Sequence, residues 1–144
     1  MVLAGNAGTG KTHLVVAIAI DAMKAGRQTR VITACEMLDE ICQANRDNID
    51  PFGAILKYKS VPVLVIDDWD KARMTEARFD YLYQIINYRY ERGLQTIVTT
   101  NEYDMVGLEH QYFAGKIEAI MTRLLENGDW VTIRRERRPD DTKR

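Results

Sequence analysis

Short apolar runs alternate along the chain with segments in which apolar residues recur at helical spacing. The apolar runs predict strands at Met1–Ala4, Arg30–Thr33, Val61–Ile66, Gln95–Thr99 and Trp130–Arg134. The helical spacing predicts helices at His13–Lys24, about Ala34–Ala44, Phe52–Tyr58, Thr75–Arg92 and Phe113–Glu126. Strands that alternate with helices form a parallel sheet with helices on both faces. The pattern therefore predicts a three-layer α/β domain on a five-stranded parallel sheet.

Composition narrows the class of protein. The 144 residues, 46% of them hydrophobic, suffice for one domain with its own core, and the net charge of −1 provides no global attraction to nucleic acid or membrane. No apolar run is long enough to cross a bilayer, and no secretory signal follows Met1. Cys35 and Cys42 lack the C-x-x-C spacing and are expected to be buried, reduced thiols. These features predict a cytoplasmic protein.

A glycine-rich loop follows the first strand. Its sequence fits the pattern G-x-x-x-x-G-K-[ST], in which backbone N–H groups converge on the phosphates of a nucleotide. Lys11 then reaches the β- and γ-phosphates, and the Thr12 hydroxyl holds Mg²⁺. A plain glycine-rich turn is the alternative, but the strand–loop–helix setting favours ATP binding. The candidate nucleotide-binding residues are Gly5, Asn6, Ala7, Gly8, Thr9, Gly10, Lys11, Thr12 and His13. A lone histidine there, such as His13, is most often a bystander.

Two acids end the most apolar strand. Val63–Asp68 is four apolar residues followed by Asp67 and Asp68, so the strand delivers both acids to the sheet edge where ligands bind. Asp67 is predicted to hold Mg²⁺ opposite Thr12, and Asp68 to orient and deprotonate the attacking water. The acids can instead cap the following turn, but the phosphate-binding loop favours the functional interpretation.

The next strand ends in Thr99, Thr100 and Asn101. Because parallel strands end at one edge of the sheet, Asn101 is expected beside the same crevice. There it is suited to hydrogen-bond the γ-phosphate or the lytic water. It can also cap a helix that begins near Glu102, and the two roles are compatible.

A closer resemblance to known proteins runs over nearly the whole chain. The stretches that carry it are Gly5–Thr12, Val63–Asp68, Leu82–Arg89 and Thr96–Asn101. They resemble the AAA+ ATPase domain of bacterial replicative-helicase loaders of the DnaC/DnaI type and the related transposition ATPases of the IstB type. The resemblance implies that Lys11 and Thr12 belong to Walker A, that Asp67 and Asp68 are the Walker B acids, and that Asn101 is the sensor-1 residue.

The resemblance also implies partners. Ile120–Leu124 is similar to the box VII of this family, which makes Arg123 the candidate arginine finger, a catalytic group supplied to a neighbouring subunit of a head-to-tail homo-oligomer. Without the resemblance, Arg123 is one more solvated helix arginine. Single-stranded DNA is expected on Glu36–Ser60, where Lys57, Tyr58 and Lys59 form a phosphate-plus-stacking unit among several acids.

The chain departs from the family pattern in several places. It begins at the first strand, so the region that binds the helicase in relatives is expected to be absent. Asp68 stands where most AAA+ proteins have glutamate, which predicts slow hydrolysis because catalysis is sensitive to small displacements. Ala119 stands where relatives often carry a further basic residue. The sensor-2 position falls at Pro139, with Arg137 and Arg138 as substitutes.

No helical lid domain is expected. The predicted organisation is an AAA+ core over residues 1–134 and a basic tail over 135–144.

Three functions are compatible with these features. The first is a Mg²⁺-dependent ATPase that acts as a helicase loader in DNA replication. The second is an IstB-type transposition helper, which a neighbouring transposase gene would favour. The third is a nucleotide-binding remnant or adaptor without catalysis, which a measurement of ATP hydrolysis would separate from the other two.

Overall fold

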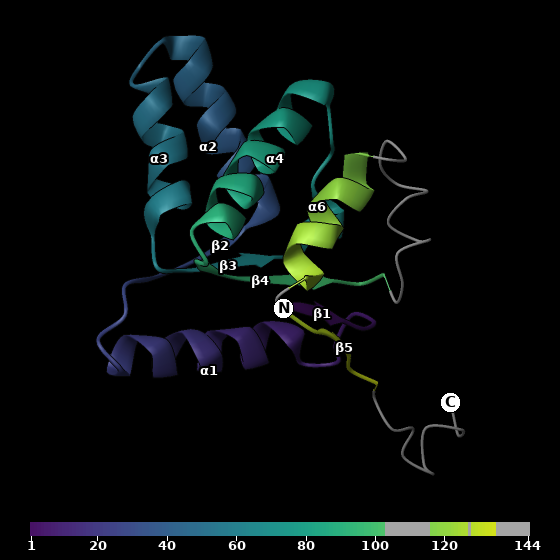
Figure 1. The fold of residues 1–144 in the computed structure, drawn as a ribbon. Helices are drawn as coiled ribbons and strands as arrows, with labels where there is room; N and C mark the ends of the chain where they lie inside the picture. Colours follow the sequence, from purple (N-terminus) through teal and green to yellow (C-terminus); the bar gives the residue numbers. More distant parts are fainter. Residues whose placement is uncertain (103–115, 127, 135–144) are drawn as a thin grey trace.

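The predicted alternation of strands and helices is present in the computed structural model of the protein, which describes residues 1–102, 116–126 and 128–134. In chain order the elements are β1 (Val2–Ala4), α1 (Lys11–Lys24), β2 (Thr29–Thr33), α2 (Ala34–Asp47), α3 (Pro51–Ser60), β3 (Val63–Asp67), the 3-10 turn η1 (Trp69–Lys71), α4 (Glu76–Glu91), β4 (Gln95–Thr100), α6 (Lys116–Leu125) and β5 (Trp130–Thr132). Figure 1 shows these elements as a sheet between two helical layers. The predicted three-layer α/β architecture is confirmed.

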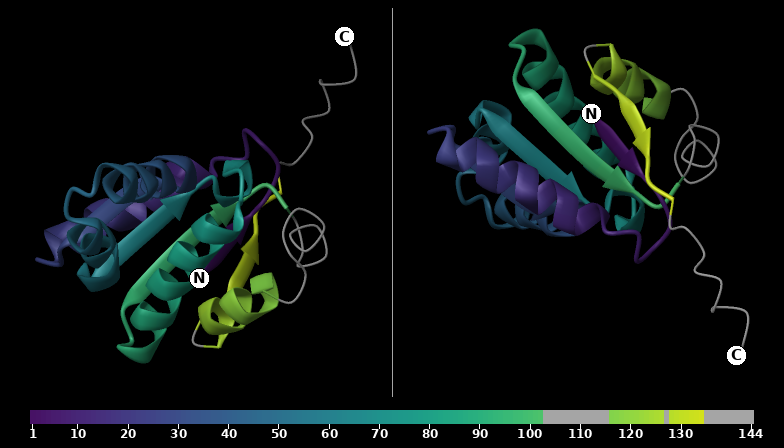
Figure 2. Two further views of the ribbon diagram at one scale, coloured as in Figure 1. Left: turned by 90° about the horizontal axis from the view of Figure 1, so that it is seen from above. Right: turned by 90° about the horizontal axis from the view of Figure 1, so that it is seen from below.

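The five strands form one parallel sheet in the order β2-β3-β4-β1-β5. From β1 the chain crosses to the outermost position with β2 and returns through β3 and β4, which pairs with β1. Strand β5 then pairs with β1 on its other side (Figure 2). All strands therefore finish at one edge of the sheet. Ala4, Asp67 and Thr100 are brought together there from distant parts of the sequence.

The helices are divided unequally between the two faces of the sheet. In Figure 1, α1 lies on one face, whereas α2, α3, α4 and α6 lie on the other. Because successive side chains of a strand point to opposite faces, the strands supply two cores. Val2, Leu64, Ile66 and Val98 pack in the larger core with α2, α4 and α6. Leu3, Val65 and Ile97 pack in a smaller core with Val15 and Ala19 of α1.

Element boundaries differ from the predicted ones by a few residues. Helix α2 continues to Asp47 and ends where Asn48 adopts the left-handed conformation, φ 52°. Strand β3 begins at Val63 rather than Val61, since Pro62 has no N–H for a strand ladder. Thr75 caps α4 as predicted, accepting a hydrogen bond from the Arg78 N–H at 3.4 Å. The start predicted for the last helix, Phe113, lies outside the described residues.

A buried arginine ties α4 to the sheet. Arg89 is fully buried, and its guanidinium donates to the backbone carbonyls of Tyr58, Lys59, Val61 and Gln95 and to the Thr96 hydroxyl. Burial lowers the pKa of Arg89 to about 10. These bonds satisfy carbonyl groups at the end of α3, just before β3 and at the start of β4, so a single side chain joins α3, α4 and the strand starts.

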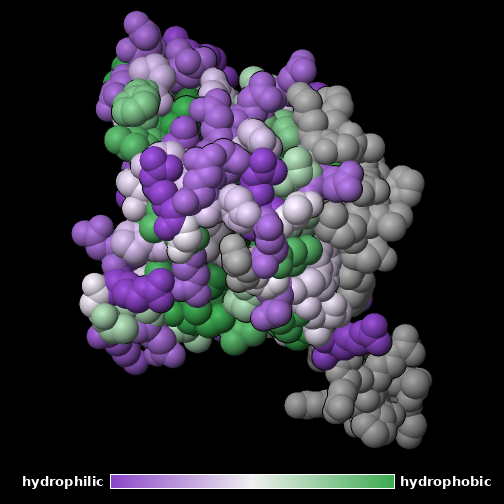
Figure 3. All heavy atoms as spheres, in the orientation of Figure 1, coloured by the Kyte–Doolittle hydropathy of each residue, from purple (hydrophilic) through white to green (hydrophobic). Residues whose placement is uncertain are grey.

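The surface is uneven in polarity. Figure 3 shows hydrophilic side chains over most of the visible face and hydrophobic ones low on the molecule and at its upper left. Several exposed hydrophobic residues belong to α1, namely Leu14, Val16, Ile20 and Met23. No described helix has the length and apolar composition that crossing a lipid bilayer requires.

Both cysteines are free thiols, as predicted, but the expectation that they are buried is wrong. Cys35 and Cys42 are only half-buried. Cys35 lies beside η1, where its thiol donates to the Lys71 carbonyl oxygen at 3.3 Å. The two residues sit on the flank of α2, whereas Met37, Leu38 and Ile41 occupy its buried face.

Candidate nucleotide-binding site

The loop between β1 and α1 owes its shape to glycines in the left-handed region. Gly8 has φ 78° and Gly10 has φ 91°, and a Cβ added at either position would meet no atom within 4 Å. Glycine is favoured at both because of backbone conformation rather than space. Gly10 is the N-cap of α1 and provides no side-chain cap, so the first N–H groups of the helix remain available to an anion.

Gly5 serves a different purpose. A Cβ at this position would lie 2.4 Å from the Ile133 carbonyl oxygen, which is far inside van der Waals contact. Ile133 approaches so closely because its N–H donates to the Ala4 carbonyl at 2.7 Å. The first glycine of the loop is therefore required by the chain that continues β5.

Lys11 is almost fully buried, and its ammonium lies against the inner side of the loop. The Nζ atom donates to the carbonyl oxygens of Gly5 at 2.5 Å and Asn6 at 3.0 Å, and to Asn101 Oδ1 at 2.9 Å. All three acceptors are uncharged. A phosphate oxygen would be a stronger partner for this ammonium, because its negative charge adds Coulombic attraction to the hydrogen bond.

Thr12 and Asp67 meet from opposite sides of the crevice. The Thr12 hydroxyl at the start of α1 donates to Asp67 Oδ2 at 2.9 Å, and the Thr99 hydroxyl donates to Asp67 Oδ1 at 2.5 Å. The Asp68 N–H donates in turn to the Thr99 hydroxyl at 2.8 Å. Asp67 is 7% exposed and held at both oxygens. No role was predicted for Thr99, which fixes this carboxylate.

The donor set of this crevice fits Mg²⁺. The described residues contain no cluster of three or more His, Cys, Asp or Glu side chains that would form an all-protein metal cage. Mg²⁺ is usually held by one or two carboxylates together with substrate phosphates and water. Thr12 and Asp67 supply the oxygen atoms that such a site needs from the protein.

Asp68 occupies a strained backbone position. Its φ of 52° is in the left-handed region, and it begins the sharp turn that leads into η1. Lys71 donates from Nζ to Asp68 Oδ2 at 2.6 Å, and this hydrogen bond raises the pKa of Lys71. The carboxylate predicted to activate water is thus paired with a lysine.

Asn101 lies at the end of β4, beside the loop as predicted. Its side-chain oxygen accepts from Lys11, while its backbone N–H and side-chain Nδ2 both donate to Asp70 at 2.8 Å. Asp70 was not among the predicted site residues. Its one sequence signal was that it is the third acid within the four residues Asp67–Asp70.

The remaining loop residues are solvent-facing. Asn6, Ala7 and His13 are exposed, and the Thr9 hydroxyl donates to the Asn6 carbonyl oxygen at 2.9 Å. His13 lies on the first turn of α1 beyond Thr12. The structure therefore brings together Lys11, Thr12, Asp67 and Asn101, with His13 outside their hydrogen-bond network.

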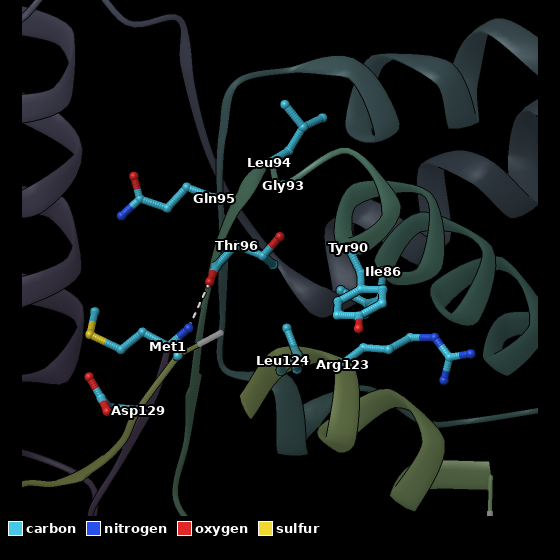
Figure 4. A pocket seen from close by; sticks show the side chains of 11 residues that line it. Met1, Ile86, Tyr90, Gly93, Leu94, Gln95, Thr96, Arg123, Leu124 and Asp129 are labelled. Carbon is cyan, nitrogen blue, oxygen red and sulfur yellow. Dashed lines mark hydrogen bonds between the residues drawn. The ribbon is translucent and has the colours of Figure 1, made fainter. Parts of the chain in front are cut away.

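Arg123 lies apart from these residues. It belongs to α6, and its guanidinium donates to Asn87 Oδ1 at 2.6 Å, to the Tyr83 hydroxyl at 3.0 Å and to the Ala119 carbonyl at 2.8 Å. It also lines a cavity of about 410 Å³ beside the amino-terminal ends of β1 and β4, with its guanidinium directed away from Met1 and Thr96 (Figure 4). Within one chain, Arg123 does not join the loop. It is half-buried, so a freely solvated arginine is ruled out.

The predicted DNA-binding segment needs one correction. Tyr58 is fully buried, and its hydroxyl hydrogen-bonds Glu40, so it is not available to stack on a base. Lys57 forms an ion pair with the same Glu40 and lies over the Tyr58 ring. The sequence spacing suggested a surface aromatic, but α3 turns this side chain against α2 and the start of β2. The sensor-2 candidates Arg137 and Arg138 lie outside the described residues.

Known proteins resemble this chain in sequence. The chain is 31% identical over 102 residues to the "Insertion sequence IS5376 putative ATP-binding protein" of Geobacillus stearothermophilus. The aligned segment covers 68% of this chain and 38% of that protein. It is 31% identical over 112 residues to the chromosomal replication initiator protein DnaA of Francisella philomiragia, covering 74% of the chain and 22% of that protein. The chain thus spans less than half the length of these relatives.

Solved structures resemble the fold. A crystal structure of DnaI superposes with a TM-score of 0.80 at 30% identity, over 93% of this chain and 72% of that one. The DnaC helicase loader superposes with a TM-score of 0.80 at 24% identity, over 93% and 77%. DnaA bound to AMPPCP and single-stranded DNA superposes with a TM-score of 0.79 at 24% identity, over 94% of this chain and 40% of that one. The fold is therefore that of an AAA+ P-loop domain, and the described residues include no helical lid.

One family model spans nearly the entire sequence. It is that of the IstB-like ATP binding proteins, and it matches residues 1–143. The match includes the loop, both strand-end acids and Asn101. The chain belongs to the family of IstB-like ATP binding proteins.

Proposed function

We propose that this chain is a Mg²⁺-dependent ATPase core that acts on DNA as a helper of transposition. The observation that carries the ATPase is the convergence of Lys11, Thr12, Asp67 and Asn101 at one sheet edge through direct hydrogen bonds. The match to the IstB-like family and the similarity to an insertion-sequence protein support the transposition role.

Each residue has a distinct task in this proposal. Lys11 binds the β- and γ-phosphates in exchange for its present carbonyl partners, and Thr12 and Asp67 hold Mg²⁺. When bound, the metal neutralises charge that develops on the phosphates. Asp68 orients the attacking water and accepts its proton, and Asn101 hydrogen-bonds the γ-phosphate or that water. Residues 1–134 form this core, and the basic residues 135–144 are assigned to a tail.

Nucleotide titration calorimetry tests the binding step. With ATP and Mg²⁺, Lys11→Ala is expected to lower affinity about a hundredfold, because the lost contact to the phosphates contributes about 3 kcal/mol, the upper end of the range for a charged hydrogen bond, and tenfold in affinity corresponds to about 1.4 kcal/mol. Lys24→Ala is the matched control, since that side chain is 75% exposed and lies at the far end of α1. Equal affinity in wild type and Lys11→Ala would refute the proposal.

A neighbouring subunit is proposed to supply Arg123. The separation of Arg123 from the loop within one chain supports this arrangement, as does the family resemblance. Arg123→Ala and Asp68→Asn should each lose turnover, whereas a mixture of the two should recover part of it, because some interfaces then combine intact halves. If the mixture is no more active than its components, Arg123 does not act between subunits.

A helicase loader in DNA replication is the second candidate. The 30% identity to DnaI over 93% of the chain favours it. ATP hydrolysis with and without single-stranded DNA, followed by binding assays with a replicative helicase and with a transposase, separates the two roles. A protein that binds nucleotide but never hydrolyses it under these conditions would instead be an adaptor.

A further inference from the structure

One carboxylate holds both the backbone and the side chain of Asn101. Asp70 Oδ1 accepts from the Asn101 backbone N–H, and Asp70 Oδ2 accepts from Asn101 Nδ2, each at 2.8 Å. Both residues are half-buried, so solvent competes only partly for these bonds. A two-point contact of this kind restricts rotation of the asparagine side chain.

The two neighbours of Asn101 also determine which way its amide faces. A carboxylate only accepts hydrogen bonds and an ammonium only donates them. The amide nitrogen must therefore face Asp70, and the amide oxygen must face Lys11, whose Nζ is 2.9 Å from Oδ1. A flipped amide would place its oxygen against the Asp70 carboxylate and its NH₂ group against the Lys11 ammonium, and neither contact is a hydrogen bond. The bond to Asp70 uses one N–H of the amide nitrogen, which leaves its second N–H for another acceptor.

The turn after β3 holds Asp70 in place. Asp68 adopts the left-handed conformation, and its carbonyl accepts from the Lys71 N–H at 3.1 Å, which closes the turn. Trp69, in the middle of this turn, is 1% exposed and packs in the larger core. A buried anchor on one side of Asp70 and a closed turn around it leave its carboxylate little freedom.

We infer that Asp70 is a positioning residue, which fixes the Asn101 amide so that its oxygen faces Lys11 and its second N–H is available to the γ-phosphate or the lytic water. The orientation of the amide is a property of the folded chain alone. Its consequence for hydrolysis rests on the proposed function.

Steady-state kinetics test the consequence. Asp70→Asn keeps the size of the side chain but presents an N–H₂ group to one of the two donors of Asn101, so the amide is no longer held. We expect kcat to fall about tenfold with nucleotide affinity unchanged within about twofold, because a misplaced group affects the transition state more than binding. Asp21→Asn is the matched control, since Asp21 is 80% exposed on α1.

A double-mutant cycle separates positioning from general stabilisation. If Asp70 acts through Asn101, then adding Asp70→Asn to Asn101→Ala should lower kcat no further. Full additivity of the two losses would overturn the inference, as would a kcat of Asp70→Asn within twofold of wild type.

Amide NMR tests the orientation without turnover. In wild type, the side-chain NH₂ signals of Asn101 should be split unusually far apart, because one hydrogen bonds a carboxylate; Asn101→Ala assigns these signals. Asp70→Asn should collapse this splitting and shift the Asn101 backbone N–H, while Asp21→Asn leaves both unchanged. Unchanged Asn101 signals in Asp70→Asn overturn the inference. Inactive wild type with the expected NMR change overturns the proposed function and leaves the positioning role intact.

Discussion

At the scale of single residues, the site contains side chains that restrain one another before any nucleotide arrives. Lys11 is bonded to Asn101, Thr12 is bonded to Asp67, and Asp68 is bonded to Lys71. In the proposed function, the first two pairs keep these side chains close to the positions in which they would bind ATP and Mg²⁺. The third pair opposes the chemistry, since an ammonium occupies an oxygen of the proposed base.

Removing Lys71 should release this base. We expect Lys71→Met to raise the rate of ATP hydrolysis by up to about fivefold, because an exposed ion pair contributes about 0.2–1 kcal/mol and tenfold in rate corresponds to about 1.4 kcal/mol. Single-turnover hydrolysis measures this rate. Lys24→Met, which removes the exposed ion pair with Asp21 on α1, is the control. A decrease comparable to that of Asp68→Asn would mean that Lys71 assists the reaction.

Arg89 is expected to control stability rather than activity. Arg89→Met leaves one buried and two partly buried carbonyls without this donor, and an unsatisfied buried group costs about 1–3 kcal/mol, so the free energy of unfolding should fall by about 3 kcal/mol. Urea denaturation measures the loss. Arg92→Met, whose side chain is 50% exposed, should change stability by less than about 0.5 kcal/mol. Similar midpoints for both variants would contradict this role.

At the scale of elements, β5 and the phosphate-binding loop are coupled through Gly5. Strand β5 pairs with β1, and the chain that follows it passes so close to Gly5 that no side chain fits there. The edge strand thereby supports the start of the loop. A Cβ at Gly8 or Gly10 would meet open space instead, so glycine is required there by the left-handed backbone conformation.

Gly5→Ala should therefore loosen β5 from β1. Overpacking of this kind costs about 1–3 kcal/mol, and we expect the Ile133 amide to exchange its hydrogen faster because its bond to the Ala4 carbonyl is strained. Hydrogen exchange monitored by NMR measures this effect. Gly8→Ala is the comparison, since it should weaken nucleotide binding without changing exchange at Ile133. Unchanged exchange in Gly5→Ala would show that the loop absorbs the methyl group.

At the scale of the whole molecule, the sheet edge joins parts of the chain that lie some ninety residues apart, as Lys11 and Asn101 do. A ligand bound there links β1, β3, β4 and α1 at once. Nucleotide binding should consequently stabilise the whole fold and not the loop alone.

Thermal unfolding measures this stabilisation. ATP with Mg²⁺ at about a hundred times its Kd adds about 2.7 kcal/mol to the free energy of unfolding, which raises Tm by roughly 5–10 °C for a chain of this size. Removal of Mg²⁺ with EDTA should reduce the increase, because Thr12 and Asp67 then lose their link to the phosphates. Lys11→Ala should show almost no increase, and an equal increase in this variant would place the nucleotide elsewhere.

Much of the fold followed from local pattern. The buried run before Asp67, the cap at Thr75 and the glycines after β1 each depend on neighbours in sequence, so the elements and their order were predicted to within a few residues. The exceptions were a few boundaries, such as the start of β3 after Pro62 and the end of α2 at Asn48. Tyr58 was misjudged for a non-local reason, since its burial depends on α2 and not on its own segment.

The sequence by itself determined the chemistry available at the sheet edge: a loop for phosphates, two acids, and a polar strand end. The tertiary structure alone decided the pairings among these groups. Asp70 meets Asn101 because β3 and β4 end side by side and a left-handed residue turns the chain sharply after β3, and Arg89 is buried because α4 packs over the strand starts. Residue types and spacing specify local conformation, whereas hydrogen-bond partners distant in sequence depend on how the layers pack.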